Sequence, residues 1–351
     1  MKYPEFLKKH DIIGYVAPSF GCAIEPYRTA FMRARSVIKK KQQGEQLGPN
    51  CFADDGIGIS TTPEKCADEF VKMYCNVSNQ ALISCGGGEL MCEILPYIDF
   101  EALYNAEPKW FMGYSDNTNL TFILTTALDI ASIYGPCISS FGMDPWHPSI
   151  HDAFDLLCGD ERIVKTNDDG IKTVHIHNYD GWEIESAKDE KNPYAPYQIS
   201  ELFMPVCFNG REASGRLIGG CLDVLNNIAG TRFDMVGRFN KKYGSEGILW
   251  YLESCDLNVM DMRRALWHLK EAGWFECASG FLIGRPMHFD EPMFGTDRHS
   301  AVTDALKDIN VPIIMDLDIG HLPPMMPLIN GSFSHVSCKG RAFAIDMELR
   351  V

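Results

Sequence analysis

The chain has 351 residues, and its 47 Asp and Glu side chains exceed its 32 Lys and Arg side chains, giving a formal net charge of −15. Hydrophobic residues make up 46% of the sequence and charged residues 23%, a globular composition that excludes disorder as the dominant state. The acidic balance argues against general nucleic-acid binding and against binding to anionic membranes, because both need clustered basic side chains. At roughly 150 residues per domain, the length predicts about two domains.

The N-terminal sequence, MKYPEFLKKHDIIGYVAPS, lacks the continuous apolar segment and the small-residue cleavage site of a signal peptide. No stretch approaches the roughly 18 apolar residues of a membrane-spanning helix. The 13 cysteines are odd in number and irregularly spaced, and they form no Cys-x-x-Cys pair. We therefore expect a cytoplasmic protein with reduced thiols and no structural zinc.

The first part of the chain alternates between short apolar strands and helices. In chain order, the patterns predict strands at 12–16, 81–84 and 109–114 and helices at 27–41, 63–73 and 120–128, with Thr61 or Thr62 capping the second helix. Strands that alternate with helices favour parallel βαβ units. We expect an N-terminal, Rossmann-like parallel α/β domain over residues 1–166.

The character of the sequence changes over residues 167–212, which are rich in Asp, Lys, Asn, Tyr and Trp and have weak periodicity. This segment is interpreted as a linker and substrate loop, with a small hairpin around Asp180-Gly181. Apolar runs then resume, predicting strands at 247–252, 278–283 and 311–315 and an amphipathic helix at 260–272 that ends at Gly273. A second domain is therefore expected over residues 213–351.

One predicted strand runs directly into Gly113-Tyr114-Ser115-Asp116-Asn117, and a helix follows. A serine at such a turn projects its hydroxyl above the carboxyl edge of a sheet, where the helix N-terminus favours developing negative charge. These residues are not Gly-x-Ser-x-Gly, and Ser, Asp and Asn are also good helix caps. The pattern therefore indicates either a nucleophile or a capped helix.

Another strand runs into Gly86-Gly87-Gly88. Backbone N–H groups of such a run can bind an oxyanion, although a tight turn or a phosphate-binding loop has the same composition. The dinucleotide spacing Gly-x-Gly-x-x-Gly fails because Met91 occupies its last position, and the lysine of a Walker motif is absent. We therefore expect no nucleotide cofactor.

A serine nucleophile needs a base and an acid that orients it. His321 lies in Gly320-His321-Leu322-Pro323-Pro324, a stiff loop that suits a positioned base but also a structural histidine. Glu253 closes the apolar run 248–252, where it needs a partner unless it reaches water. His175 and His177 would share one face of a strand, but no third ligand is evident, so no metal site is expected.

Taken together, these segments resemble the LD-carboxypeptidase family of serine peptidases, which includes the microcin C self-immunity proteins. Six ordered motifs carry the resemblance across nearly the whole chain. They are residues 13–19, Gly87-Gly88 with 94–99, 113–118, 217–222 with Gly230-Thr231, 248–253 with 269–273 and 280–285, and 318–321 with 324–326.

The resemblance implies a Ser–Glu–His triad of Ser115 as nucleophile, Glu253 as orienting acid and His321 as base, with no metal and no cofactor. The implied oxyanion donors are the backbone N–H groups of Gly88 and Asp116. The family fold implies a C-terminal domain with a barrel-like sheet and flanking helices, and a site between the two domains. Gly87 and Trp182 are predicted to contact substrate.

Two positions depart from the family pattern. Cys221 stands where the family has asparagine, and residues 327–331 differ after Met326. The first functional hypothesis is an LD-carboxypeptidase acting on cytosolic murein peptides. The alternative is an immunity-type hydrolase of peptidyl- or aminoacyl-nucleotides, in which Trp182, Tyr194 and Tyr197 stack on a base or merely pack their loop. A third hypothesis is a catalytically silent small-molecule binder on the same scaffold. Family resemblance also predicts a homodimer.

Overall fold

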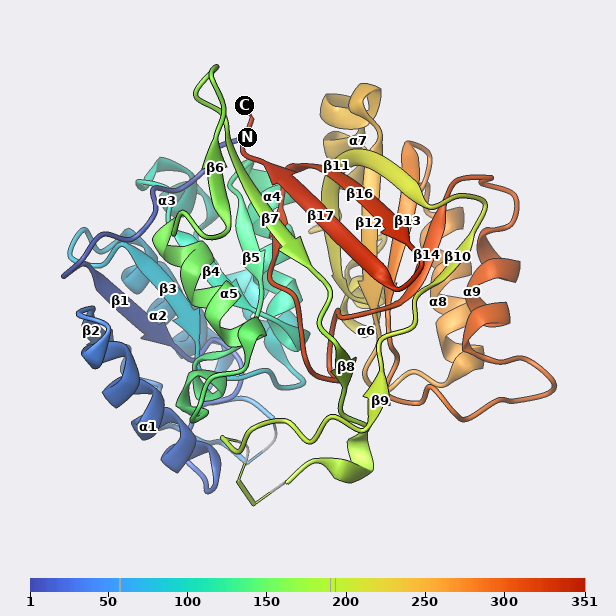
Figure 1. Cartoon of the computed structure of the whole chain (residues 1–351). Helices are drawn as coiled ribbons and strands as arrows, with labels where there is room; N and C mark the ends of the chain where they lie inside the picture. The colour runs from blue at the N-terminus through green and yellow to red at the C-terminus, as the bar shows by residue number, and fades with distance from the viewer. Residues whose placement is uncertain (57, 190, 193, 351) are drawn as a thin grey trace.

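The computed structural model describes residues 1–56, 58–189, 191–192 and 194–350. It has two α/β domains, each built around one large sheet: most of the first is blue to green in Figure 1 and most of the second is yellow to red. The predicted fold class is confirmed. No helix in these ranges combines the length and the apolar character needed to cross a bilayer.

The first sheet has six strands in the order β15-β5-β4-β3-β1-β2. Its first five strands in sequence pair in parallel, as the βαβ pattern predicts, and β15 pairs antiparallel to β5. The strands are β1 (Ile12–Val16), β2 (Gly44–Leu47), β3 (Ala81–Ser84), β4 (Trp110–Gly113), β5 (Ser132–Tyr134) and β15 (Leu328–Asn330). The helices of this part are α1 (Tyr27–Lys40), α2 (Pro63–Cys75), α3 (Phe100–Asn105), α4 (Thr118–Leu128) and α5 (Pro148–Cys158).

The second sheet has nine strands in the order β10-β14-β13-β12-β11-β16-β17-β7-β6. Its strands are β6 (Val164–Thr166), β7 (Lys172–His177), β10 (Val206–Phe208), β11 (Glu212–Cys221), β12 (Ile248–Glu253), β13 (Ala278–Gly284), β14 (Ile313–Leu317), β16 (Phe333–Lys339) and β17 (Ala342–Glu348). The middle four, β11 to β14, are parallel, and the others pair antiparallel. Its helices are α6 (Leu222–Ile228), α7 (Val236–Tyr243), α8 (Val259–Glu271) and α9 (Arg298–Leu306).

Helix α4 joins the two domains. It contacts both β5 of the first sheet and β11 of the second, and every residue except Ala127 is buried. Phe122 on this helix stacks on Trp274 of the second domain, with ring centroids 5.2 Å apart. The helix is therefore buried on all sides, with elements of both domains covering it.

The segment 167–212 corrects part of the sequence interpretation. A linker and substrate loop was expected, but the two ends of the segment are strands of the second sheet, β7 and β10. The expected local hairpin at Asp180-Gly181 is also wrong, because β8 (Gly181–Trp182) pairs with the distant β9 (Glu201–Leu202). Only the middle of the segment is irregular, and the division at residues 166 and 213 stays a proposal.

Candidate active site

The carboxyl ends of parallel strands from both sheets meet at one place. β4 ends just before Ser115, β12 ends on Glu253, and the loop after β14 carries His321. Ligand sites of α/β proteins lie at this edge because the loops that leave the carboxyl ends of the strands form a crevice there. The two predicted halves of the site therefore converge from different domains.

Ser115 occupies a strained turn. Its φ angle is 63°, in the left-handed region that costs a non-glycine residue energy, and it starts the 3-10 turn Ser115–Asn117 that leads into α4. Asn117 secures the turn by donating from its amide nitrogen to the carbonyl oxygens of Gly86 and Tyr114. This is the geometry of a nucleophile elbow, which holds the hydroxyl above the sheet.

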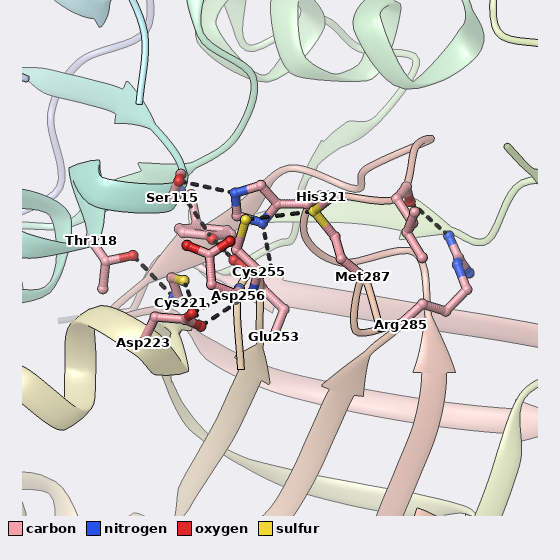
Figure 2. A network of polar contacts seen from close by, with 12 residues as sticks. Ser115, Thr118, Cys221, Asp223, Glu253, Cys255, Asp256, Arg285, Met287 and His321 are labelled. Carbon is pink, nitrogen blue, oxygen red and sulfur yellow. Dashed lines mark hydrogen bonds and ion pairs between the residues drawn. The ribbon is translucent and has the colours of Figure 1, made fainter. Parts of the chain in front are cut away.

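The three side chains form a continuous hydrogen-bonded row, shown in Figure 2. Ser115 Oγ lies 2.9 Å from His321 Nε2, and His321 Nδ1 lies 2.8 Å from Glu253 Oε2. The Glu253 side chain is fully buried and the His321 side chain is 12% exposed. The sequence hypotheses of a helix cap, a structural histidine and a solvated glutamate therefore do not account for how these residues are placed.

Tyr134, at the end of β5, is a fourth member that sequence reasoning missed. Its buried hydroxyl donates to Glu253 Oε1 at 2.5 Å and accepts from the backbone N–H of Ser115 at 3.2 Å. It thus connects Glu253 of the second domain with the backbone of the Ser115 turn in the first. A short run such as Ser132–Tyr134 carries no signal for this role, which arises only when the domains meet.

The row has a definite electrostatic character. Burial acts against a charged His321, but the adjacent Glu253 carboxylate raises the pKa of His321 well above its ordinary value. Burial likewise acts against a charged Glu253, yet His321 and the hydrogen bonds it shares with His321 and Tyr134 leave the pKa of Glu253 lowered. The pair therefore favours an imidazolium beside a carboxylate, the form that a base adopts after accepting a proton.

The histidine loop is clamped from several sides. The Met326 N–H donates to the Asp318 carbonyl at 2.8 Å, closing the loop on itself. Arg285 forms a buried ion pair with Asp318 at 2.7 Å and donates to the Leu322 carbonyl at 3.2 Å. Gly320 is required beside the acid, since its φ is 99° and a Cβ there would lie 2.4 Å from Glu253 Oε2.

The glycine run lies against the serine. A Cβ on Gly87 would lie 3.1 Å from Ser115 Oγ, and one on Gly88 would lie 2.2 Å from Ser19 Oγ. In the described part of the chain, the Gly88 N–H donates to no other group. Asp116 N–H lies in the first turn of a 3-10 helix, where amides lack a partner within the helix. Both amides belong to residues that line one cavity with Ser115.

Two cavities flank the serine–histidine pair. A cavity of about 510 Å³ is lined by His321 and Tyr114, together with Tyr27 from the first domain and Tyr197 from the irregular segment. A second cavity, of about 80 Å³, is lined by Ser115 and by Gly88 and Asp116. His321 therefore lines one cavity and Ser115 the other.

The aromatic residues predicted to contact substrate have different positions. Tyr197 lines the large cavity, but Trp182 does not. Trp182 is 8% exposed. Its ring centroid lies 5.0 Å from the guanidinium carbon of Arg285, and the ring packs edge-on to Phe289. Tyr194 lies under the guanidinium of Arg33 instead. The tryptophan therefore supports the clamp on the histidine loop rather than the cavity wall.

Comparison with known protein families identifies the family to which the chain belongs. Residues 13–135 match the LD-carboxypeptidase N-terminal domain, and residues 214–336 match the LD-carboxypeptidase C-terminal domain. The chain therefore belongs to the LD-carboxypeptidase family of serine peptidases, as its motifs predicted.

Among individual relatives, the chain is 29% identical to a putative carboxypeptidase of Vibrio cholerae, over 93% of this chain and 92% of that protein. It is 25% identical to the microcin C7 self-immunity protein MccF of Escherichia coli, over 91% and 88%. It is 24% identical to a probable murein peptide carboxypeptidase of Bacillus subtilis, over 98% and 94%.

Solved structures share the fold. An MccF-like protein of Bacillus anthracis superposes with a TM-score of 0.82 at 20% identity, covering 99% of each chain. MccF in complex with glutamyl sulfamoyl guanosine superposes with a TM-score of 0.79 at 20% identity, covering 99% of this chain and 98% of that one.

Proposed function

We propose that the chain is a serine-dependent amide hydrolase in which Ser115, His321 and Glu253 form the catalytic triad. The row of hydrogen bonds through the three side chains, at 2.9 and 2.8 Å, carries this proposal. The family membership supports a peptidase, and the buried acid behind the base supports a Ser–Glu–His mechanism.

In the first half of the reaction, Ser115 Oγ attacks the amide carbonyl carbon while its proton passes to His321 Nε2. The carbonyl oxygen becomes an oxyanion, which the N–H groups of Gly88 and Asp116 stabilise. The C–N bond then breaks, and His321 gives its proton to the departing nitrogen. In the second half, water attacks the acyl-enzyme while His321 takes its proton, the bond to Ser115 Oγ breaks, His321 returns the proton to Ser115 Oγ, and the carboxylic acid product leaves.

The direction of proton transfer orients the substrate. His321 must reach the departing nitrogen, so the leaving group lies on the side of the large cavity that His321 lines. A volume of about 510 Å³ greatly exceeds a released alanine and suits a nucleoside, and Tyr114 and Tyr197 offer aromatic faces for a base. The substrate favoured by this geometry is therefore an aminoacyl- or peptidyl-nucleotide, the alternative sequence hypothesis. The MccF complex with glutamyl sulfamoyl guanosine has a ligand of this class.

A murein tetrapeptide that loses its terminal D-alanine is the second candidate. Lys188 lines the large cavity and could meet a terminal carboxylate, although it already pairs with Glu185. The Bacillus subtilis relative named as a probable murein peptide carboxypeptidase also favours it.

One assay separates these substrates. The purified protein is incubated with an aminoacyl-sulfamoyl adenosine and, separately, with a murein tetrapeptide, and the products are identified by mass spectrometry. Release of the sulfamoyl nucleoside supports the first candidate, and release of D-alanine alone supports the second. Either activity must disappear in Ser115→Ala. If neither substrate is cleaved, the silent binder is favoured.

The homodimer expected from the family is part of the proposal, and sedimentation velocity tests it.

A further inference from the structure

The small cavity beside Ser115 has a one-sided charge. Its charged lining residues are four carboxylic acids, Glu89, Asp116, Asp223 and Asp256, and no basic side chain of the described residues joins them. Asp223 and Asp256 lie close to Cys221, on the Ser115 side of the site (Figure 2). Glu89 and Asp256 are exposed at the opening, and Asp116 is buried.

The negative charges of these acids act on one another. Burial raises the pKa of Glu89, and the carboxylates of Asp256, Asp116 and Asp223 raise it further. Asp223 is held in place, because its carboxylate accepts from the backbone N–H groups of Cys255 at 3.2 Å and Asp256 at 2.9 Å. The charge of His321 acts against the rise in the pKa of Glu89 but does not cancel it, so the negative charge fixed beside Ser115 favours the binding of a further cation.

A buried amide oxygen without a hydrogen-bond partner also indicates a ligand at this cavity. Asn119 lines the same cavity and is 1% exposed. Its amide nitrogen donates to the Asp116 carbonyl at 2.9 Å and to Asp116 Oδ1 at 3.0 Å, which fixes which end of the amide is nitrogen. Within the described residues, its oxygen Oδ1 accepts no hydrogen bond. A buried acceptor left unpaired calls for a donor from a ligand.

The departure at Cys221 belongs to this cavity. Its thiol lines the cavity and lies 3.4 Å from Asp223 Oδ2, as a donor to that carboxylate. The residue thus presents a sulfur to the cavity and leaves the carboxylate charge of Asp223 in place.

We propose that the small cavity receives the acyl side of the substrate and selects an acyl group with a positively charged side chain, an ammonium in particular. This inference rests on the proposed function, because the leaving group must lie with His321 in the large cavity and the acyl side is then directed to the other. Asp223 supplies an oriented acceptor in the lining of the cavity, Asn119 supplies an unpaired buried acceptor beside it, and Glu89 and Asp256 supply exposed charge.

The test compares lysyl-, norleucyl- and glutamyl-sulfamoyl adenosine. Norleucine matches the length of lysine but lacks the ammonium, and glutamate reverses the charge. We expect kcat/KM for the lysyl compound to exceed that for the norleucyl compound by about tenfold, with the glutamyl compound slowest, since partly solvated charges are screened. Equal rates, or a preference for the glutamyl compound, would overturn the inference.

Variants locate the preference. Glu89→Gln and Asp256→Asn should each lower the lysyl-to-norleucyl ratio by about threefold, and together they should bring it close to one. Glu107→Gln is the matched control, because Glu107 is an exposed acid at the amino end of β4, opposite the site, and it should leave the ratio unchanged. A ratio that Glu107→Gln lowers as much as Asp256→Asn does would contradict the assignment.

A binding measurement keeps this inference distinct from the proposed function. Titration calorimetry with Ser115→Ala protein gives the affinity of the three compounds without turnover. Tighter binding of the lysyl compound by about tenfold supports the cationic preference, and equal affinities overturn it. If the wild-type protein cleaves none of the compounds, the proposed hydrolase fails, while the ratio of affinities still decides the charge preference.

Discussion

Replacing Glu253 by glutamine tests how the acid controls the base. The Tyr134 hydroxyl already accepts from the Ser115 N–H, so its own proton must go to Glu253 Oε1. In Glu253→Gln, the single amide oxygen is therefore held by Tyr134, and the amide nitrogen faces His321 Nδ1. Because an amide nitrogen only donates, Nδ1 must accept and the imidazole proton moves to Nε2. That tautomer cannot take the proton of Ser115.

The expected loss is large. A wrong tautomer, together with the loss of the carboxylate that stabilises the imidazolium, lowers kcat by about 10³ to 10⁴. This corresponds to about 4 to 5.5 kcal/mol of transition-state stabilisation. The loss should remain smaller than that of Ser115→Ala, because an orienting group contributes less than the nucleophile. The residual activity should reach its plateau at lower pH, since the carboxylate that raises the pKa of His321 is gone.

A second substitution sharpens the test. In Glu253→Gln with Tyr134→Phe, the amide is free to turn its oxygen toward His321, so activity should recover at least about tenfold over the single variant. The control is Glu253→Gln with Tyr251→Phe. The Tyr251 hydroxyl donates to Asn330 and not to Glu253, so this double variant should show no recovery. For all four proteins, the rate of cleavage of the aminoacyl-nucleotide is measured across a range of pH. Glu253→Gln activity within tenfold of wild type, or no recovery in the double variant, would refute this reasoning.

Four further outcomes are expected. Because the pKa of His321 is raised, kcat/KM of the wild type should rise with pH through an apparent value above 6.5, and a flat profile from pH 6 to 8 would contradict a triad base. By the same shift, the ion pair with Glu253 stabilises the fold fully below the unfolded pKa of about 6.5 and is lost as pH rises through the folded value, so the difference in Tm between wild type and His321→Ala should shrink at alkaline pH. Gly320→Ala places a Cβ 2.4 Å from Glu253 Oε2 at a φ of 99°, so it should cost about 2 to 4 kcal/mol of stability and most activity, measured by denaturant unfolding. Tyr197→Ala should raise KM for the nucleotide more than it lowers kcat. If the same substitution changed the kinetics of D-alanine release from a murein peptide to the same extent, the result would count against a base-binding role for Tyr197.

Much of the N-terminal fold was predictable because its signals are local. β1 and β3 lie where the apolar runs placed them, and α2 ends only two residues beyond its prediction. Strands buried on both faces are continuous apolar runs, and proline and glycine mark their ends. The hairpin of β16 and β17 was missed although buried and exposed residues alternate along both strands, a period-2 signal that could have found it.

The rest depended on contacts between distant residues. β15 joins the first sheet from residue 328 onward, and β7 pairs with β17 across more than 160 residues, so no local pattern marks their partners. The triad positions were reached through family motifs, since each residue alone suited a structural role equally well. Tyr134 and the acid-lined cavity had no sequence signal, because the first depends on an interdomain contact and the second gathers acids from separate loops.

The central claim is that Ser115 is a nucleophile activated by His321. The most direct measurement is labelling with a fluorophosphonate, followed by peptide mapping by mass spectrometry. One adduct is predicted on Ser115 in the wild type, formed much more slowly in His321→Ala and absent in Ser115→Ala. Labelling at another residue, or labelling of Ser115 at the same rate without His321, would contradict the triad.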